Sequence, residues 1–322
     1  MQAYPLKFRP ILKDRLWGGT KLRDVLKKEI PTDTTGESWE ISTVPGDVSV
    51  VGNGAYAGKN IQELLEAYGP DFVGTSVHRR FGREFPILIK FIDAKQDLSV
   101  QLHPNDELAK ERHNSFGKTE MWYVMDADPG AQLIVGFNKD VTKEEYGAAL
   151  ENDGLLNLLH YEQVTEGDTF FINTGKIHAI GAGVLLAEIQ QTSDVTYRVF
   201  DFNRRDKDGN FRELHTDLAL DAIDYKKKND FKVSFETNAN RSNAMVDCPY
   251  FKTQFLRLTQ DHNLDTATRD SFTILMCVGG SGAVHTAQGR VPLQRGETVL
   301  VPACAERIGI ETSGATFLEV TI

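Results

Sequence analysis

The segment 98–103 alternates apolar and polar side chains, as a strand with one buried face does. Ser99, Gln101 and His103 would then share the polar face. A glutamine oxygen and an imidazole nitrogen can both bind a metal ion, whereas the same face on a solvated sheet edge would have no chemical role. The segment alone leaves both interpretations open.

His103 becomes more informative when it is considered with Glu120 and His178. Glu120 opens a predicted strand on which Lys118 has the same parity, and His178 lies at a turn of the same β-rich region. Two imidazoles and a carboxylate can bind Zn²⁺ or another divalent ion and leave a coordination position open. We therefore predict a metal site at these residues, with Gln101 beside it.

A charged residue also lies inside an apolar strand farther along the chain. Arg198 has mostly apolar and aromatic neighbours, so it needs an anionic partner. That partner is either a protein carboxylate, Asp194 or Asp201, or an oxyanion of a ligand held by the guanidinium fork. Glu188 and Gln190 share one face of the preceding predicted strand.

Short strands separated by Gly, Asn and Asp turns must position these residues. The predicted strands are 37–42, 85–93, 98–102, 121–127, 170–172, 184–190 and 196–200. Helical patterns are confined to the first 225 residues: 61–68 after Asn60, a short helix after Asn105, one at Thr142 with a Glu145 capping box, and 218–225 after Thr216. The polar stretch 226–243 is a candidate linker, and only strand-like runs follow it.

One pattern occurs twice without a gap. Gly167-Asp168 and Gly296-Glu297 each open a turn, an apolar strand and a second turn follow, and the pattern ends at His178 and Arg307. This predicts two related β-domains. A guanidinium stays protonated and cannot bind a metal, so we expect the second domain to be metal-free. Its predicted core strand residues are Phe272, Ile274, Leu275, Val299 and Val301.

Composition excludes several classes of protein. The 322 residues carry a formal net charge of −10, which argues against nucleic acid as a partner. No apolar run approaches the ~18 residues of a membrane helix, and the N-terminus lacks a signal-peptide pattern. We therefore expect a cytoplasmic protein with no membrane partner. Cys248, Cys277 and Cys304 have no CxxC spacing, which indicates reduced thiols.

Over nearly its whole length the sequence resembles the type I mannose-6-phosphate isomerases, in their shorter bacterial form. The most specific segments are Gln101-Leu102-His103-Pro104 and Lys118-Thr119-Glu120-Met121-Trp122, and further similarity lies at 16–19, 36–42, 99–106, 177–180 and 190–194. The resemblance implies a mainly β fold of two cupin-like jelly-roll domains with added helices in the N-terminal part. We place the catalytic, zinc-binding domain at 1–235 and the metal-free domain at 236–322.

The resemblance also implies roles for individual residues. Gln101, His103, Glu120 and His178 match the positions that bind one zinc ion per chain. Arg198 matches a catalytic arginine, Ser99, Lys118 and Glu188 match active-site positions, and Arg204 falls where larger relatives have a lysine near the phosphate. Asn173 replaces the proline of the general cupin motif, and the long helical insertion of larger eukaryotic relatives is absent.

The implied reaction interconverts D-mannose 6-phosphate and D-fructose 6-phosphate through an enediolate, with a small-molecule sugar phosphate as the partner. A zinc ion near the sugar oxygens would lower the barrier, and Glu188 or Lys118 would move the proton. Two alternatives remain at this stage: a cupin dioxygenase, because two histidines and a carboxylate also bind non-haem iron, and a non-catalytic sugar-phosphate-binding protein. The sequence does not specify an oligomeric state.

Overall fold

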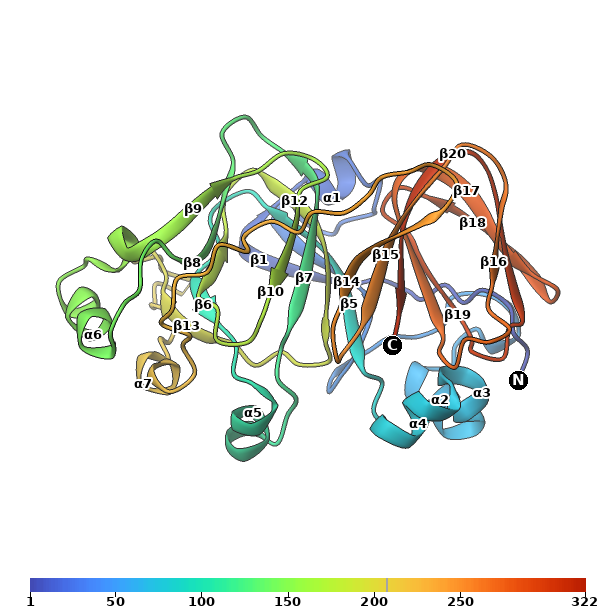
Figure 1. Cartoon of the computed structure of the whole chain (residues 1–322), viewed down its shortest axis with the longest axis horizontal. Coiled ribbons are helices and arrows are strands. Elements are labelled where there is room, and N and C mark those ends of the chain that lie inside the picture. The colour runs from blue at the N-terminus through green and yellow to red at the C-terminus, as the bar shows by residue number, and fades with distance from the viewer. Residues whose placement is uncertain (207) are drawn as a thin grey trace.

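The computed structural model describes residues 1–206 and 208–322, which form two β-units (Figure 1). The first unit is drawn in blue to yellow and the C-terminal unit in orange to red. Within each sheet every strand pairing is antiparallel. No helix in the described part of the chain is long and apolar enough to span a membrane.

The first unit contains two facing sheets. One has the order β1 (Ile11–Gly19), β2 (Thr35–Ile41), β5 (Ile87–Ala94), β12 (Val184–Gln191), β7 (Glu120–Ala127) and β10 (Thr169–Ile172). The other has the order β13 (Tyr197–Phe200), β6 (Val100–Leu102), β11 (His178–Ile180), β8 (Gln132–Phe137) and β9 (Leu159–Gln163). A short hairpin joins β3 (Thr43–Val44) to β4 (Asp47–Val48). Side chains from both sheets, such as Trp122, Leu133 and Phe170, fill the space between them.

The C-terminal unit is a second antiparallel sandwich. Its strands are β14 (Ser242–Asp247), β15 (Lys252–Leu258), β16 (His262–Asp265), β17 (Thr273–Thr286), β18 (Gly289–Gln294), β19 (Thr298–Val301) and β20 (Arg307–Thr321). The five residues predicted to be core strand residues are all fully buried, and four of them lie in β17 or β19, whereas Phe272 lies directly before β17: Phe272, Ile274, Leu275, Val299 and Val301. The prediction of a mainly β, cupin-like fold is also confirmed.

The helices all belong to the part of the chain before residue 225, as predicted. They are α1 (Lys21–Asp24), α2 (Ile61–Tyr68), α3 (Pro70–Val73), α4 (Thr75–Phe81), α5 (Asp106–His113), α6 (Lys143–Glu151) and α7 (Thr216–Leu220), with 3₁₀ turns at Gly54–Tyr56 and Leu155–Leu158. Asn60, Asn105 and Thr142 each accept a hydrogen bond from a backbone N–H of the first turn, so these three residues are the caps of α2, α5 and α6 as predicted. The capping box predicted at Thr142 is only half formed, because the Glu145 side chain accepts from Lys139 instead.

The predicted helix 218–225 is wrong at both ends. Helix α7 begins at Thr216, and His215 occupies the cap position. The chain leaves the helix after Leu220 because the next residues bind elsewhere: the N–H of Asp224 donates to the Gly175 carbonyl, and the Tyr225 carbonyl accepts from Val141.

One hydrophobic cluster contains residues of both units. Leu6 pairs with Leu300, and the Phe72 and Asp71 carbonyls accept hydrogen bonds from Ala303 and Cys304. Helices α2 to α4 accordingly lie against the C-terminal strands (Figure 1). Because the first residues of the chain pack on the last strands, the division at 235/236 stays a prediction. All three cysteines are free, as predicted.

The internal repeat is present in space, but its two halves differ in register. Gly167 and Gly296 both have left-handed φ values, +93° and +90°, and each precedes an equivalent strand, β10 or β19. After the second turn, however, His178 lies inside the first sandwich with 1% exposure, whereas Arg307 is exposed and Ile308 lies inside the second.

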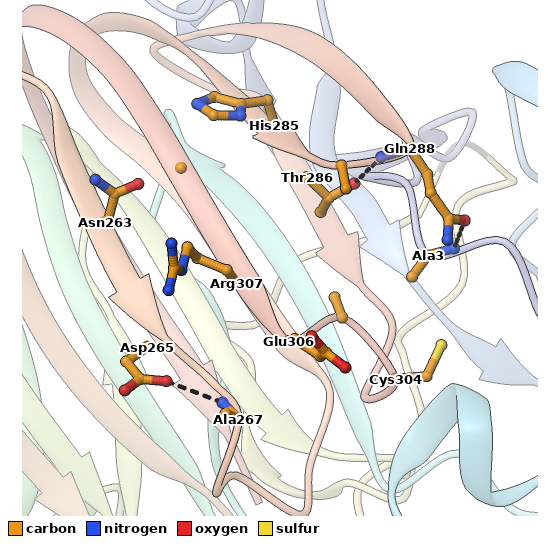
Figure 2. Close-up of a pocket in the computed structure, with 13 residues that line it drawn as sticks. Ala3, Asn263, Asp265, Ala267, His285, Thr286, Gln288, Cys304, Glu306 and Arg307 are labelled. Atoms are coloured by element: carbon orange, nitrogen blue, oxygen red, sulfur yellow. Dashed lines mark hydrogen bonds between the residues drawn. The ribbon is translucent and has the colours of Figure 1, made fainter.

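The prediction that Arg307 occupies the place of His178 is therefore wrong. A shift of one residue moves a side chain to the other face of a strand. The second turns differ: Gly175 has φ +81°, and the aligned Cys304 is not in the left-handed region. Figure 2 shows Arg307 on the outer face, in an open hollow of about 900 Å³ beside Asn263 and Asp265. The interior position equivalent to His178 is filled by an isoleucine.

Candidate metal centre and active site

Three buried ligand residues meet at one end of the first sandwich. His103 directly follows β6, Glu120 opens β7 and His178 opens β11, and their ligand atoms lie within 4.8 Å of one another. His103 Nε2 is 3.1 Å from Glu120 Oε1, and His178 Nε2 is 3.9 Å from Glu120 Oε2. Each residue is 1% exposed. The structure thus brings together the three residues that the sequence analysis combined.

The donor atoms of this cluster suit a divalent metal ion. His103 Nδ1 lies 2.9 Å from the Val195 carbonyl, and His178 Nδ1 lies 2.8 Å from the Lys176 carbonyl, which directs both Nε2 lone pairs inward. Within the described residues, both Nε2 atoms and both Glu120 oxygens lack a hydrogen-bond partner. Buried polar atoms are rarely left unpaired, and a cation would satisfy all four.

The protonation states also fit a metal. Burial lowers the pKa of His103 to about 3 and lowers that of His178. Burial acts to raise the pKa of Glu120, but the interaction with His103 and the positive charge of Lys118 outweigh it and hold the pKa well below its usual range. At neutral pH the imidazoles are neutral and the carboxylate is charged, as metal binding requires.

Strand register places two further predicted residues in line with His178. Gln101 on β6 is paired with His178 on one side and with Arg198 on the other. Directly paired residues point to the same face of a sheet, and neighbouring strands lie ~4.8 Å apart. The three side chains therefore form a row about two strand spacings long, with the metal cluster at one end and the guanidinium at the other.

A cavity of about 280 Å³ opens along this row. Five predicted site residues line it: Ser99, Gln101, Lys118, Glu188 and Arg198. Arg204 does not line it, because its guanidinium donates to Asp201 and to the Asp97 carbonyl. The lining residues that the sequence analysis missed as site residues include Arg15, Trp17, Glu37, Trp39, Lys90 and Arg212. Lys90 could have been found from the sequence, because it is a cation inside an apolar strand, the same feature that identified Arg198.

Glu188 is held by hydrogen bonds to both of its oxygens. Lys90 Nζ is 2.8 Å from Oε2, and Trp122 Nε1 donates to Oε1 at 2.9 Å. Lys90 also donates to Gln190 at 2.6 Å, which confirms that Glu188 and Gln190 share a face. Burial raises the pKa of Glu188, although the charge of Lys90 opposes the shift. A fixed carboxylate with a raised pKa beside a cavity is suited to proton transfer.

Among the residues that the structure describes, Arg198 forms no ion pair with Asp194 or Asp201, which was one of its two predicted explanations. Asp201 instead accepts hydrogen bonds from Arg204 and Arg212. Arg198 donates to the Glu213 carbonyl at 2.9 Å, and its buried Nε has no partner within the described residues. This arrangement favours the other explanation, an anionic group supplied by a ligand.

Comparison with known proteins gives a consistent result. Residues 6–131 match the family model "Phosphomannose isomerase type I, catalytic domain", and residues 241–318 match "Mannose-6-phosphate isomerase, cupin domain". The chain is 35% identical to mannose-6-phosphate isomerase ManA of Bacillus subtilis over 305 residues, 94% of each protein. It is 33% identical to mannose-6-phosphate isomerase of Streptococcus mutans over 93% of each.

Solved structures agree. The mannose 6-phosphate isomerase from Bacillus subtilis superposes with a TM-score of 0.90 at 32% identity over the whole of both chains. A variant of phosphomannose isomerase from Salmonella typhimurium, at 17% identity over 98% of each chain, has a TM-score of 0.80 and shares the fold.

Proposed function

This chain belongs to the type I phosphomannose isomerases, and we propose that it interconverts D-mannose 6-phosphate and D-fructose 6-phosphate with one zinc ion per chain. The observation that carries the proposal is a set of four buried ligand atoms on His103, Glu120 and His178 that make no hydrogen bond within the described residues and lie beside a polar cavity. Gln101, which lines that cavity next to His178, is the fourth ligand in this proposal. When bound, zinc supplies Lewis-acid polarisation of the sugar oxygens.

Glu188 carries the proton in this proposal. Isomerisation of the aldose removes a proton from C2 and returns one to C1, while a hydroxyl proton moves from O2 to O1, and the intermediate is an enediolate. Glu188 faces the cavity, and Lys90 fixes its orientation. Lys118 Nζ lies 3.3 Å from Glu120 Oε1, so it is tied to the ligand cluster and lies near the sugar oxygens instead.

The guanidinium of Arg198 stabilises the developing oxyanion. It follows Gln101 directly in the cross-strand row, and its buried Nε is free to donate. Ser99, which lines the cavity on the same strand segment as Gln101, contacts the phosphate in this proposal, and Arg204, which lies outside the cavity, supports the phosphate end through the buried Asp201.

The test is isomerisation of mannose 6-phosphate by metal-free and zinc-loaded protein. A chelator should abolish turnover and Zn²⁺ should restore it. Glu188→Gln should lower kcat by at least ~100-fold with zinc content unchanged, as expected for a general base. Glu151→Gln, an exposed carboxylate on α6, is the matched control. Oxygen uptake in an iron-loaded sample, or retained binding with unaltered substrate, would contradict the proposal.

A further inference from the structure

The segment between β13 and α7 brings a third arginine to the cavity. It folds back on itself through a bridge between Arg205 and Phe211. Arg212 follows this bridge and lines the cavity together with Arg198, whereas Arg204 and Arg205 do not. The side chain of Arg205 instead lies over the Phe211 ring and donates to the Gly209 carbonyl.

A buried carboxylate fixes the orientation of Arg212. Asp201, 6% exposed, accepts from Arg212 Nε at Oδ2 (2.7 Å) and from Arg212 Nη2 at Oδ1, and it also accepts from Arg204. Burial acts to raise the pKa of Asp201, but the hydrogen bonds from the two arginines lower it below its usual range. The bidentate contact uses one edge of the Arg212 guanidinium. Its Nη1 makes no hydrogen bond within the described residues.

The guanidinium groups around Asp201 are only partly paired. Arg204 and Arg212 both donate to Asp201, and within the described residues the other carboxylates of this region, Asp194 on the cavity wall and Glu213 near Arg198, make no ion pair with either of them. The lysines and the remaining arginine of the cavity wall, in contrast, are paired: Lys90 with Glu188, Arg15 with Glu37 and Lys118 with Glu120. A guanidinium that is held in place and still has a free donor, as Arg212 has at Nη1, suits a dianionic phosphate group.

The position of Arg212 is compatible with one end of the substrate. In the cross-strand row Arg198 lies directly beside Gln101, a proposed metal ligand, whereas Arg212 lines the cavity from outside that row. In a hexose 6-phosphate the phosphate lies at the opposite end of the carbon chain from C1 and C2, where the reaction occurs. A sugar with C1 and C2 beside the metal ligands and Arg198 therefore leaves its phosphate for Arg212.

We infer that Arg212 binds the phosphate of the substrate directly and sets the preference for phosphorylated sugars, with Asp201 as its positioning residue. This inference rests on the proposed function. It separates two roles: Arg198, next to Gln101, acts on the reacting oxygens, and Arg212 acts on the phosphate.

Steady-state kinetics of the zinc-loaded enzyme test the inference. Arg212→Ala should raise KM for mannose 6-phosphate and lower kcat/KM by about 10- to 100-fold, the worth of one charged hydrogen bond, with kcat within about threefold of wild type. Inorganic phosphate, used as a competitive inhibitor, should bind the variant more weakly by a similar factor. Arg205→Ala, on the same segment but outside the cavity, should change neither constant.

Arg212→Gln is a second variant that retains most of the side-chain volume, in case the alanine variant does not fold. Unchanged KM and phosphate inhibition in a folded Arg212 variant would overturn the inference, as would a fall in kcat alone. Asp201→Asn should raise KM in the same direction, since it loosens Arg212. Failure of the zinc-loaded wild-type enzyme to isomerise mannose 6-phosphate would contradict the proposed function itself. Failure of the Arg212 variants to change KM in an active enzyme would contradict only the role of Arg212.

Discussion

Zinc should stabilise the folded protein by an amount that depends on one histidine. The ligand atoms of His103, Glu120 and His178 already lie together in the fold, and the unfolded chain does not hold them together. A ligand that binds only the folded state stabilises it by RT ln(1 + [L]/Kd), about 4 kcal/mol at a free concentration 1,000 times Kd. His103→Ala removes one ligand and should remove most of this stabilisation.

The expected shift in melting temperature follows from the size of the chain. At ~2.1 cal/mol/K per residue, unfolding of 322 residues has an entropy near 0.7 kcal/mol/K, so about 4 kcal/mol corresponds to roughly 6 °C. Unfolding of the first unit alone would give a larger shift.

Differential scanning calorimetry of chelator-stripped protein, with zinc added back from a buffered stock, measures this shift. His262→Ala is the matched control, because it removes a histidine of β16 that lies outside the cluster. It should keep the full shift, whereas His103→Ala should show less than about 1 °C. A zinc-dependent shift of wild-type size in His103→Ala would place the zinc elsewhere and refute the reasoning.

Three further predictions concern pH and packing. Since burial lowers the pKa of His103 to about 3, protons should compete with zinc for this residue only in more acid solution. The zinc affinity measured by titration calorimetry should therefore change little between pH 7.5 and pH 5.5. A site with two imidazoles of ordinary pKa would lose about 100-fold in zinc affinity over the same range, and such a loss would contradict the prediction. Tyr250→Phe removes a 2.8 Å hydrogen bond to Asp106 and should lower the free energy of unfolding in urea by about 1 kcal/mol, with wild-type stability contradicting it. Ile308→Ala should lower the free energy of unfolding in the same assay by about 2–4 kcal/mol, because it removes a buried side chain. Arg307→Ala should lower it by less than about 0.5 kcal/mol. The reverse order would contradict the inward position of Ile308.

The parts of the fold and site that could be predicted from sequence are those in which apolar and polar residues alternate regularly or a local motif marks the end of an element. Alternation at 98–103 gave both the strand and the face that carries Gln101, because a strand side chain has only two directions. The caps Asn60 and Asn105 marked helix starts for a similarly local reason, a side-chain oxygen that pairs with a free N–H.

What could not be predicted depends on turns and on distant partners. The faces of Arg307 and Ile308 depend on the conformation of the turn before them, which an alignment of residue types does not contain. Arg212 lies in a polar segment with two other arginines, and only the fold shows which of them Asp201 turns toward the cavity. Lys90 was missed although it had the same apolar surroundings that drew attention to Arg198.

The C-terminal unit supports the site although the ligand cluster lies entirely in the first unit. Both faces of strand β7 are buried. Glu120 and Trp122 point toward the site, and Met121 and Tyr123 point into the hydrophobic cluster that contains residues of both units. Thr253 of the C-terminal unit contacts Met121 directly. The strand that carries a proposed metal ligand is thus packed from behind by the second unit.

A second contact joins the same two regions. The Asp106 carboxylate accepts from Tyr250 Oη, from the Gly117 N–H at 2.8 Å and from Gln191 Nε2 at 2.9 Å. Gln191 in turn accepts from the Thr119 N–H. These bonds tie the start of α5, three residues after His103, to the loop that leads into Glu120. Because a metal site needs its ligands held within fractions of an ångström, a second unit that contributes no residue to the ligand cluster can still determine how tightly the first unit holds a metal.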